Sequence, residues 1–152
     1  MNATSRTLLF ATDFSPASTP AFGQALRIAR KDGAKLLVAH AYQERSLPGL
    51  GYAAVPAYQD WDRQLREAAE RELGWLLARA RAEGVEALPL LLEGFPDEAI
   101  VEAARERNVD LIVVGTHGRR GAARLFLGSV AARVTATAPC PVLTVGPEVS
   151  PR

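Results

Sequence analysis

Short runs of consecutive apolar residues alternate along the chain with longer segments in which apolar residues recur every three or four positions. Uninterrupted apolar runs are typical of strands buried on both faces of a sheet, and the longer period is typical of amphipathic helices. The chain is therefore expected to alternate between strands and helices. The predicted strands lie at residues 8–12, 35–41, 86–93, 111–114 and 141–145.

A helix is expected after each of the first four strands, and the first helix has boundary residues of suitable chemistry. Ser15 is a good N-cap, Pro16 fits the first helical position, and Gly33 fits a C-terminal cap. The connection at residues 43–58 contains proline and glycine and is unusually long, so it is either a functional flap or a mobile segment. The predicted helices span about residues 16–32, 61–84, 96–108 and 130–138.

This alternation predicts an α/β fold. We expect a single-domain, doubly wound, five-stranded parallel sheet, Rossmann-like, in the strand order 3-2-1-4-5, with helices on both faces. That order places the third strand at an edge, as Pro89 requires, because proline cannot donate to a central ladder. The C-terminal ends of strands one and four then form the crevice where such sheets bind ligands. The length favours one domain over residues 1–152, with a core at about residues 6–146.

A glycine pattern follows the fourth strand. Gly115, Gly118 and Gly128 form the spacing G-x2-G-x9-G, and Ser129 follows the last glycine. Gly115 and Gly118 lack Cβ atoms, so the backbone can take positive φ and a ligand can lie against main-chain N–H groups. Gly128 and Ser129 open a helix, and the free N–H groups and partial positive charge of a helix start suit phosphate oxygens. The pattern therefore predicts a phosphate site.

The glycine spacing, the strand before it and the closing segment Cys140–Val145 resemble the universal stress protein family, and the agreement runs from Leu8 to Gly146. The chain is similar to the nucleotide-binding branch of that family, whose members carry this glycine spacing. The resemblance implies bound ATP, with Asp13 against the nucleotide. Contact of Asp13 with the base and contact with Mg²⁺, which prefers oxygen ligands, both remain open.

Other positions take their roles from the same resemblance. Ala41 matches the position whose backbone meets adenine in relatives. Arg119 and Arg124 could neutralise phosphate charge through bidentate contacts. In the alternative interpretation the glycines serve only tight turns, and Asp13 only caps a turn. The resemblance implies that Gly115, Thr116, Gly118 and Arg119 contact ribose and phosphates, that Gly128, Ser129 and Val130 close around the phosphate tail, and that Ala11, Thr12 and Val114 complete the nucleotide site.

No catalytic set accompanies this crevice in the sequence, which lacks a P-loop and any Cys/His metal spacing. His117 and His40 are interpreted as a polar loop residue and a satisfied strand residue. Phosphoryl transfer also needs an oriented nucleophile or water. An ATP-binding regulatory module is therefore favoured over two alternatives, which are a slow ATPase or self-phosphorylating enzyme using the same pocket and a nucleotide-free dimeric scaffold. The family resemblance also implies a homodimer formed through Val142–Val145, an apolar edge.

Composition narrows the class of protein further. The chain has 18 basic and 17 acidic residues and no basic patch interleaved with aromatic residues, which argues against a nucleic-acid partner. No apolar stretch approaches the roughly 20 residues needed to span a bilayer, and the first residues hold no apolar signal segment. The one cysteine cannot form an intramolecular disulfide and suits a reducing compartment. We expect a cytoplasmic protein that does not enter a membrane.

Overall fold

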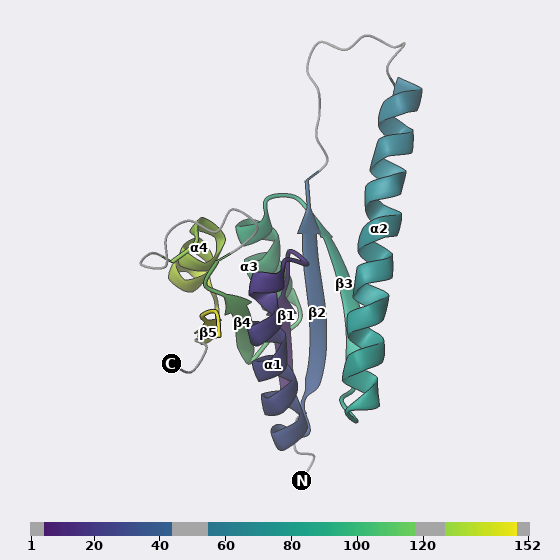
Figure 1. The fold of residues 1–152 in the computed structure, drawn as a ribbon. Helices are drawn as coiled ribbons and strands as arrows, with labels where there is room; N and C mark the ends of the chain where they lie inside the picture. Colours follow the sequence, from purple (N-terminus) through teal and green to yellow (C-terminus); the bar gives the residue numbers. More distant parts are fainter. Residues whose placement is uncertain (1–4, 44–54, 118–126, 149–152) are drawn as a thin grey trace.

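Five parallel strands form one sheet, and helices cover both of its faces (Figure 1). The structure is a computed structural model, and it describes residues 5–43, 55–117 and 127–148. The strands are β1 (Thr7–Ala11), β2 (Lys35–Tyr42), β3 (Ala87–Glu93), β4 (Leu111–Gly115) and β5 (Val142–Val145). The helices are the 3-10 turn η1 (Pro16–Ser18), α1 (Thr19–Asp32), α2 (Val55–Ala82), α3 (Pro96–Glu106) and α4 (Ser129–Thr137).

The strand order is β3-β2-β1-β4-β5, which confirms the predicted topology. Strand β1 lies at the centre, where Ala11 is paired with Ala39 of β2 on one side and with Val114 of β4 on the other. Pro89 lies opposite Val38 on the edge strand β3, where its missing N–H costs no central hydrogen bond. The C-terminal ends of β1 and β4 are therefore adjacent, as predicted.

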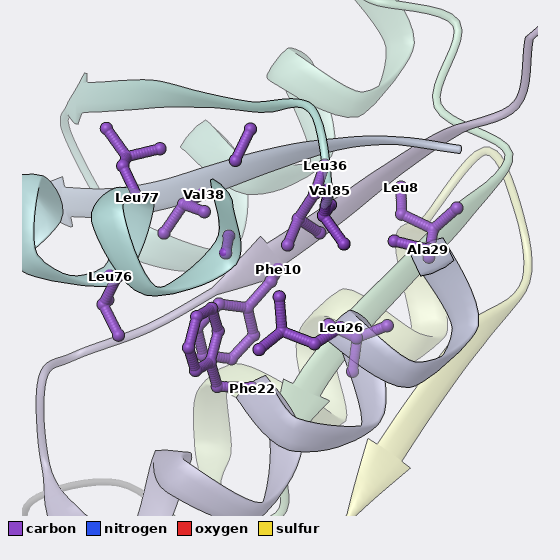
Figure 2. Close-up of a cluster of buried hydrophobic side chains, with 14 of the residues drawn as sticks. Leu8, Phe10, Phe22, Leu26, Ala29, Leu36, Val38, Leu76, Leu77 and Val85 are labelled. Carbon is purple, nitrogen blue, oxygen red and sulfur yellow. The ribbon is translucent and has the colours of Figure 1, made fainter. Parts of the chain in front are cut away.

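The sheet separates two hydrophobic cores. Helices α1 and α2 cover one face, where the rings of Phe10 and Phe22 pack with their centroids 5.3 Å apart and Leu26 lies beside them (Figure 2). Helices α3 and α4 cover the other face, where Ile112 of β4 and Val134 of α4 are fully buried. Burying a side chain of this size contributes about 1.5–3 kcal/mol. These two layers hold the strand ends in fixed relative positions.

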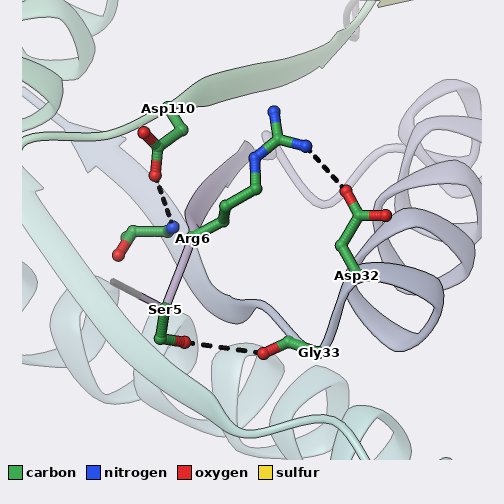
Figure 3. Close-up of polar contacts among 6 residues, drawn as sticks. Ser5, Arg6, Asp32, Gly33 and Asp110 are labelled. Carbon is green, nitrogen blue, oxygen red and sulfur yellow. Dashed lines mark hydrogen bonds and ion pairs between the residues drawn. The ribbon is translucent and has the colours of Figure 1, made fainter. Parts of the chain in front are cut away.

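Polar contacts fix the end of the sheet where the strands begin, opposite the crevice (Figure 3). The Arg6 guanidinium donates to Asp32 at the end of α1, at 2.8 Å. The main-chain N–H of Thr7 donates to the carboxylate of Asp110, just before β4, also at 2.8 Å. These contacts join the start of β1 to α1 and to the approach to β4. The elements that carry the crevice are thus tied together at their far ends.

The predicted start of the second helix is wrong. Helix α2 is described from Val55, whereas it was expected from Trp61 after a connection that extended to residue 58. Pro56 lies in the first turn, where proline is tolerated, so it did not mark a loop. Residues 44–54 of that connection lie outside the described residues. The first helix begins as the 3-10 turn η1, and Ser15 at its N-cap makes no side-chain capping bond.

Among the described residues, no helix is long and apolar enough to cross a membrane.

The other predicted boundaries agree with the structure to within two residues. Gly33 caps α1 in the left-handed conformation with a φ of 62°, as its position in the sequence indicated. The arrangement of elements around the crevice is therefore the one that the sequence predicted.

Candidate functional site

The crevice begins where β1 and β4 end side by side. Because Ala11 is paired with Val114, the next residues along each strand, Thr12 and Gly115, also lie at this end of the sheet. The N–H of Thr12 donates to the carbonyl of Ala39 at 2.9 Å. The backbone beyond β1 is thus still held to β2 where the crevice opens. The structure therefore brings together the two strand ends predicted to form the site.

A hydrogen-bonded turn carries Asp13 away from β1. The Ser18 hydroxyl donates to the Ser15 carbonyl at 2.8 Å and lies 3.0 Å from the hydroxyl oxygen of Thr12. The Thr12 hydroxyl therefore donates to Ser18, and its oxygen accepts the N–H of Phe14 at 2.9 Å. One carboxylate oxygen of Asp13 accepts the N–H of Ser15 at 2.9 Å. The half-buried carboxylate is thus oriented by its own turn, as the turn-capping alternative for Asp13 requires.

The end of β2 contacts the same turn. Ala41 is half-buried and paired with Leu92 of β3, at the end of the sheet where Asp13 lies. His40, the preceding residue, places its Nδ1 atom 2.8 Å from the carbonyl oxygen of Thr12, and its ring stacks on Phe14. The prediction that His40 is a satisfied strand residue is confirmed. The roles of Phe14 and Ser18 could not be predicted from the sequence, because both depend on contacts across the turn.

The end of β4 is closely packed against η1. A Cβ atom added to Gly115 would lie 3.3 Å from the carbonyl oxygen of Ala17 and 3.7 Å from the Cα of Ser18. The backbone of Gly115 is not in the left-handed region, so this glycine does not use the positive φ that it permits. Close approach of the neighbouring backbone, rather than an unusual dihedral angle, favours glycine here.

The start of α4 returns to the end of β4. The N–H of Gly128 donates to the carbonyl of Thr116 at 2.6 Å, and a Cβ on Gly128 would lie only 2.9 Å from that oxygen. Gly128 is the N-cap of α4, and the first helical hydrogen bond runs from Ala132 to Gly128. The amides of Ser129, Val130 and the next residue therefore lack acceptors within the helix. They are placed beside the crevice and are suited to an anion.

The remaining predicted phosphate contacts cannot be placed. Gly118 and Arg119, with Arg124, lie in residues 118–126, outside the described residues. Just before them, the Nδ1 atom of His117 lies 2.9 Å from the hydroxyl oxygen of Thr116, and the buried Nε2 atom has no hydrogen-bond partner among the described residues. The structure thus brings together the strand-end residues and the α4 residues of the predicted site.

A metal site built from protein groups alone does not fit the described residues, because they contain no group of three or more His, Cys, Asp or Glu side chains able to hold an ion. Asp13 is the one predicted ligand. Mg²⁺ is commonly bound through one or two carboxylates together with substrate phosphates and water. Asp13 therefore fits a magnesium ion only if a bound nucleotide supplies further oxygen ligands.

A separate groove of about 420 Å³ lies between the end of β3 and α3. Four glutamates line it, and their charges oppose the binding of a phosphate chain. The groove is also separated from β1 by strand β2. This groove is therefore less suited to an anion than the crevice is. The groove is lined by Leu92, Glu93, Gly94, Phe95, Glu98, Ala99, Glu102, Ala103 and Glu106.

The fold and the crevice define a doubly wound α/β protein in which a helix start with free amides lies at the topological switch point. Residues 4–146 match the model of the universal stress protein family, and the chain belongs to this family. A universal stress protein of Thermus aquaticus is 40% identical over 144 residues, which cover 92% of this chain and 98% of the relative.

Two solved structures of similar proteins contain adenine nucleotides. A universal stress protein in complex with cAMP is 30% identical, with a TM-score of 0.69, over 92% of this chain and 96% of that one. The universal stress protein of Archaeoglobus fulgidus in complex with dAMP is 29% identical, with a TM-score of 0.65, over 91% of this chain and 96% of that one. Members of the family that resemble this chain therefore bind adenine nucleotides.

Proposed function

We propose that this protein is a regulatory module that binds ATP in the crevice between β1 and β4. The observation that carries the proposal is the contact between Gly128 and Thr116, because it sets the free amides of α4 at the end of β4, the strand that pairs with β1. The complexes of related proteins with cAMP and dAMP support an adenine nucleotide as the ligand. Nucleotide occupancy would then change the surface offered to a partner protein.

Each part of the nucleotide has a proposed contact. The adenine meets the main chain at Ala41, and the carboxylate of Asp13 faces the nucleotide directly or through Mg²⁺. The phosphate tail meets the amides of Ser129 and Val130. Gly118 and Arg119 are proposed to complete the contacts to the ribose and phosphates. The remaining contacts come from the strand ends, at Ala11, Thr12, Val114, Gly115 and Thr116, and from Gly128 at the start of α4.

Calorimetric titration with ATP, AMP and cAMP tests the proposal. We expect saturable binding of ATP that weakens in Asp13→Ala, while Asp60→Ala, an exposed acid on α2 paired with Arg63, leaves the affinity unchanged. Ligand released by denaturation from the purified protein and weighed by mass spectrometry identifies what the protein carries. If neither method detects a nucleotide, the protein is a nucleotide-free scaffold and the proposal is wrong.

A second experiment on the same protein distinguishes a binding module from an enzyme. Incubation with labelled ATP is expected to leave intact ATP bound in a stoichiometric amount. Steady release of ADP, or transfer of label to the protein, that is lost in Asp13→Ala would instead support a slow ATPase or self-phosphorylating enzyme.

We also propose that two copies pair through β5. This strand lies at the edge of the sheet, and Val142–Val145 are only half-buried within a single chain. An apolar edge strand presents unpaired main-chain groups that favour pairing with another strand. A homodimer would satisfy these groups and cover the apolar side chains. Nucleotide binding and pairing would then occur at adjacent strands of the same sheet.

A further inference from the structure

His40, at the end of β2, contacts the residues on either side of Asp13. Its Nδ1 atom lies 2.8 Å from the carbonyl oxygen of Thr12. Because a carbonyl oxygen can only accept, Nδ1 carries the hydrogen in this contact. The same ring stacks on Phe14, with ring centroids 4.2 Å apart and an interplanar angle of 29°. One side chain from the neighbouring strand therefore holds both ends of a three-residue segment.

Phe14 is the strained point of that segment. Its φ is 62°, in the left-handed region that residues other than glycine enter at a cost. Such conformations persist where the surrounding contacts hold them in place. Around Phe14 these contacts include the bond from its N–H to the Thr12 hydroxyl oxygen, the stack on His40 and packing against the hydrophobic core. Loss of the stack therefore removes one of the contacts that oppose relaxation of the turn.

We infer that His40 is a positioning residue for the nucleotide site, which it serves by fixing the turn that orients Asp13. The inference rests on the proposed function, in which Asp13 meets the nucleotide. The carboxylate of Asp13 is bonded to the N–H of Ser15, so its direction follows the backbone of the turn. A turn that relaxes between several conformations must be ordered on binding, and this ordering weakens affinity.

Substitutions of His40 separate its two contacts. His40→Phe keeps a ring for stacking and loses the N–H donor, whereas His40→Asn keeps an N–H donor near the position of Nδ1 and loses the ring. We expect His40→Phe to weaken ATP binding about three- to tenfold, the size of one lost hydrogen bond. We expect His40→Ala, which loses both contacts, to weaken it more than either single change. Unaltered ATP affinity in His40→Ala would overturn the inference.

A double-mutant cycle tests whether His40 acts through Asp13. In the Asp13→Asn background, His40→Phe is expected to cost clearly less affinity than it does in the wild-type protein, because the carboxylate that it orients is gone. Equal losses of affinity in the two backgrounds would show that His40 affects binding by another route, and the inference would be wrong.

Amide hydrogen exchange tests the turn without nucleotide. The N–H groups of Phe14 and Ser15 are bonded to side chains of the turn and are expected to exchange at least threefold faster in His40→Phe, while the amide of Phe10 in β1 keeps its rate. Unchanged exchange at Phe14 and Ser15 would refute the inference whether or not ATP binds. Faster exchange in a protein that binds no ATP would support the hold of His40 on the turn and refute the proposed function.

Discussion

Gly128, at the start of α4, lies next to Thr116, the residue that follows β4. Its N–H is bonded to Thr116, and its α-hydrogen faces a carbonyl oxygen that a methyl group would approach to 2.9 Å. Its φ is –59°, which any residue adopts, so glycine is required here for space alone. At the scale of single residues, the close packing beside the crevice thus depends on the lack of a Cβ atom at Gly115 and Gly128.

Gly128→Ala is expected to lower the free energy of unfolding by about 1–3 kcal/mol, because the added methyl group must displace α4 or the end of β4. It is also expected to weaken ATP binding, since the amides of α4 move with the helix. Chemical denaturation measures the first effect and calorimetry the second. Gly74→Ala is the matched control, because a Cβ at Gly74 in α2 meets no atom within 4 Å. Gly74→Ala is expected to raise the free energy of unfolding by about 0.5–1 kcal/mol, because alanine is favoured over glycine inside a helix. A free energy of unfolding for Gly128→Ala that equals or exceeds the wild-type value would contradict the close contact.

The single cysteine gives a prediction about pH. Burial raises the pKa of the Cys140 thiol, and the nearby Asp110 charge raises it further, while a backbone hydrogen bond with Ile112 opposes the shift. The unfolded chain therefore loses this proton at lower pH than the folded protein, so this group lowers stability as the pH rises above the thiol pKa of the unfolded chain. The pH profile of iodoacetamide alkylation is expected to have a higher midpoint in the folded protein than in guanidinium chloride. A midpoint equal to or below that of the unfolded chain would contradict the burial effect.

At the scale of elements, the two halves of helix α2 differ in how deeply their side chains are buried. Its buried residues lie in its C-terminal half, and its N-terminal half extends beyond the end of β2 (Figure 1). Trp61 and Leu65 continue the apolar stripe but are 41% and 38% exposed. The sequence pattern alone treats the whole stripe as core-facing, because periodicity does not report where the sheet beneath the helix ends. The buried set is Ala69, Leu73, Leu76, Leu77 and Ala80.

Leu73 and Leu65 form a matched pair for testing this difference, because both are leucines on one face of the same helix. Leu73 is 2% exposed, so Leu73→Ala is expected to lower the free energy of unfolding by about 2–5 kcal/mol. Leu65→Ala is expected to cost less than about 1 kcal/mol, because little apolar area is lost. Denaturant titration measures both. Similar losses for the two variants would mean that Leu65 is covered in solution.

The whole molecule is organised by the strand order, which puts the proposed nucleotide crevice and the proposed pairing edge on neighbouring strands. The carbonyl of Pro141 accepts a hydrogen bond from Ile112 of β4 at 3.0 Å, and that of Val145 accepts one from Thr116, just after β4, at 2.9 Å. Successive residues of a strand direct their main-chain groups to opposite sides, so the N–H of Thr144 points to the open edge. The free edge of β5 therefore offers an N–H that a second copy could bind.

Thr144→Pro tests the proposed homodimer, because it removes this outward N–H and leaves the bonds to β4 in place. The wild-type protein is expected to have twice the chain mass of 16.3 kDa in sedimentation equilibrium, and Thr144→Pro the mass of one chain. Thr144→Val keeps the N–H and is expected to remain dimeric. A wild-type mass equal to one chain at micromolar concentration would exclude pairing through β5 under these conditions.

The sequence by itself determined the strands, the edge position of β3 and the place of the crevice. Apolar runs, helix periods and a proline such as Pro89 are local properties, and the rules for connecting them leave few topologies. Tertiary structure alone decided that Gly128 returns to Thr116, that Gly115 is packed against η1, and that His40 holds the Asp13 turn. The last contact joins residues 28 positions apart. Such contacts depend on strand register and on how the chain returns to the sheet, which no local pattern encodes.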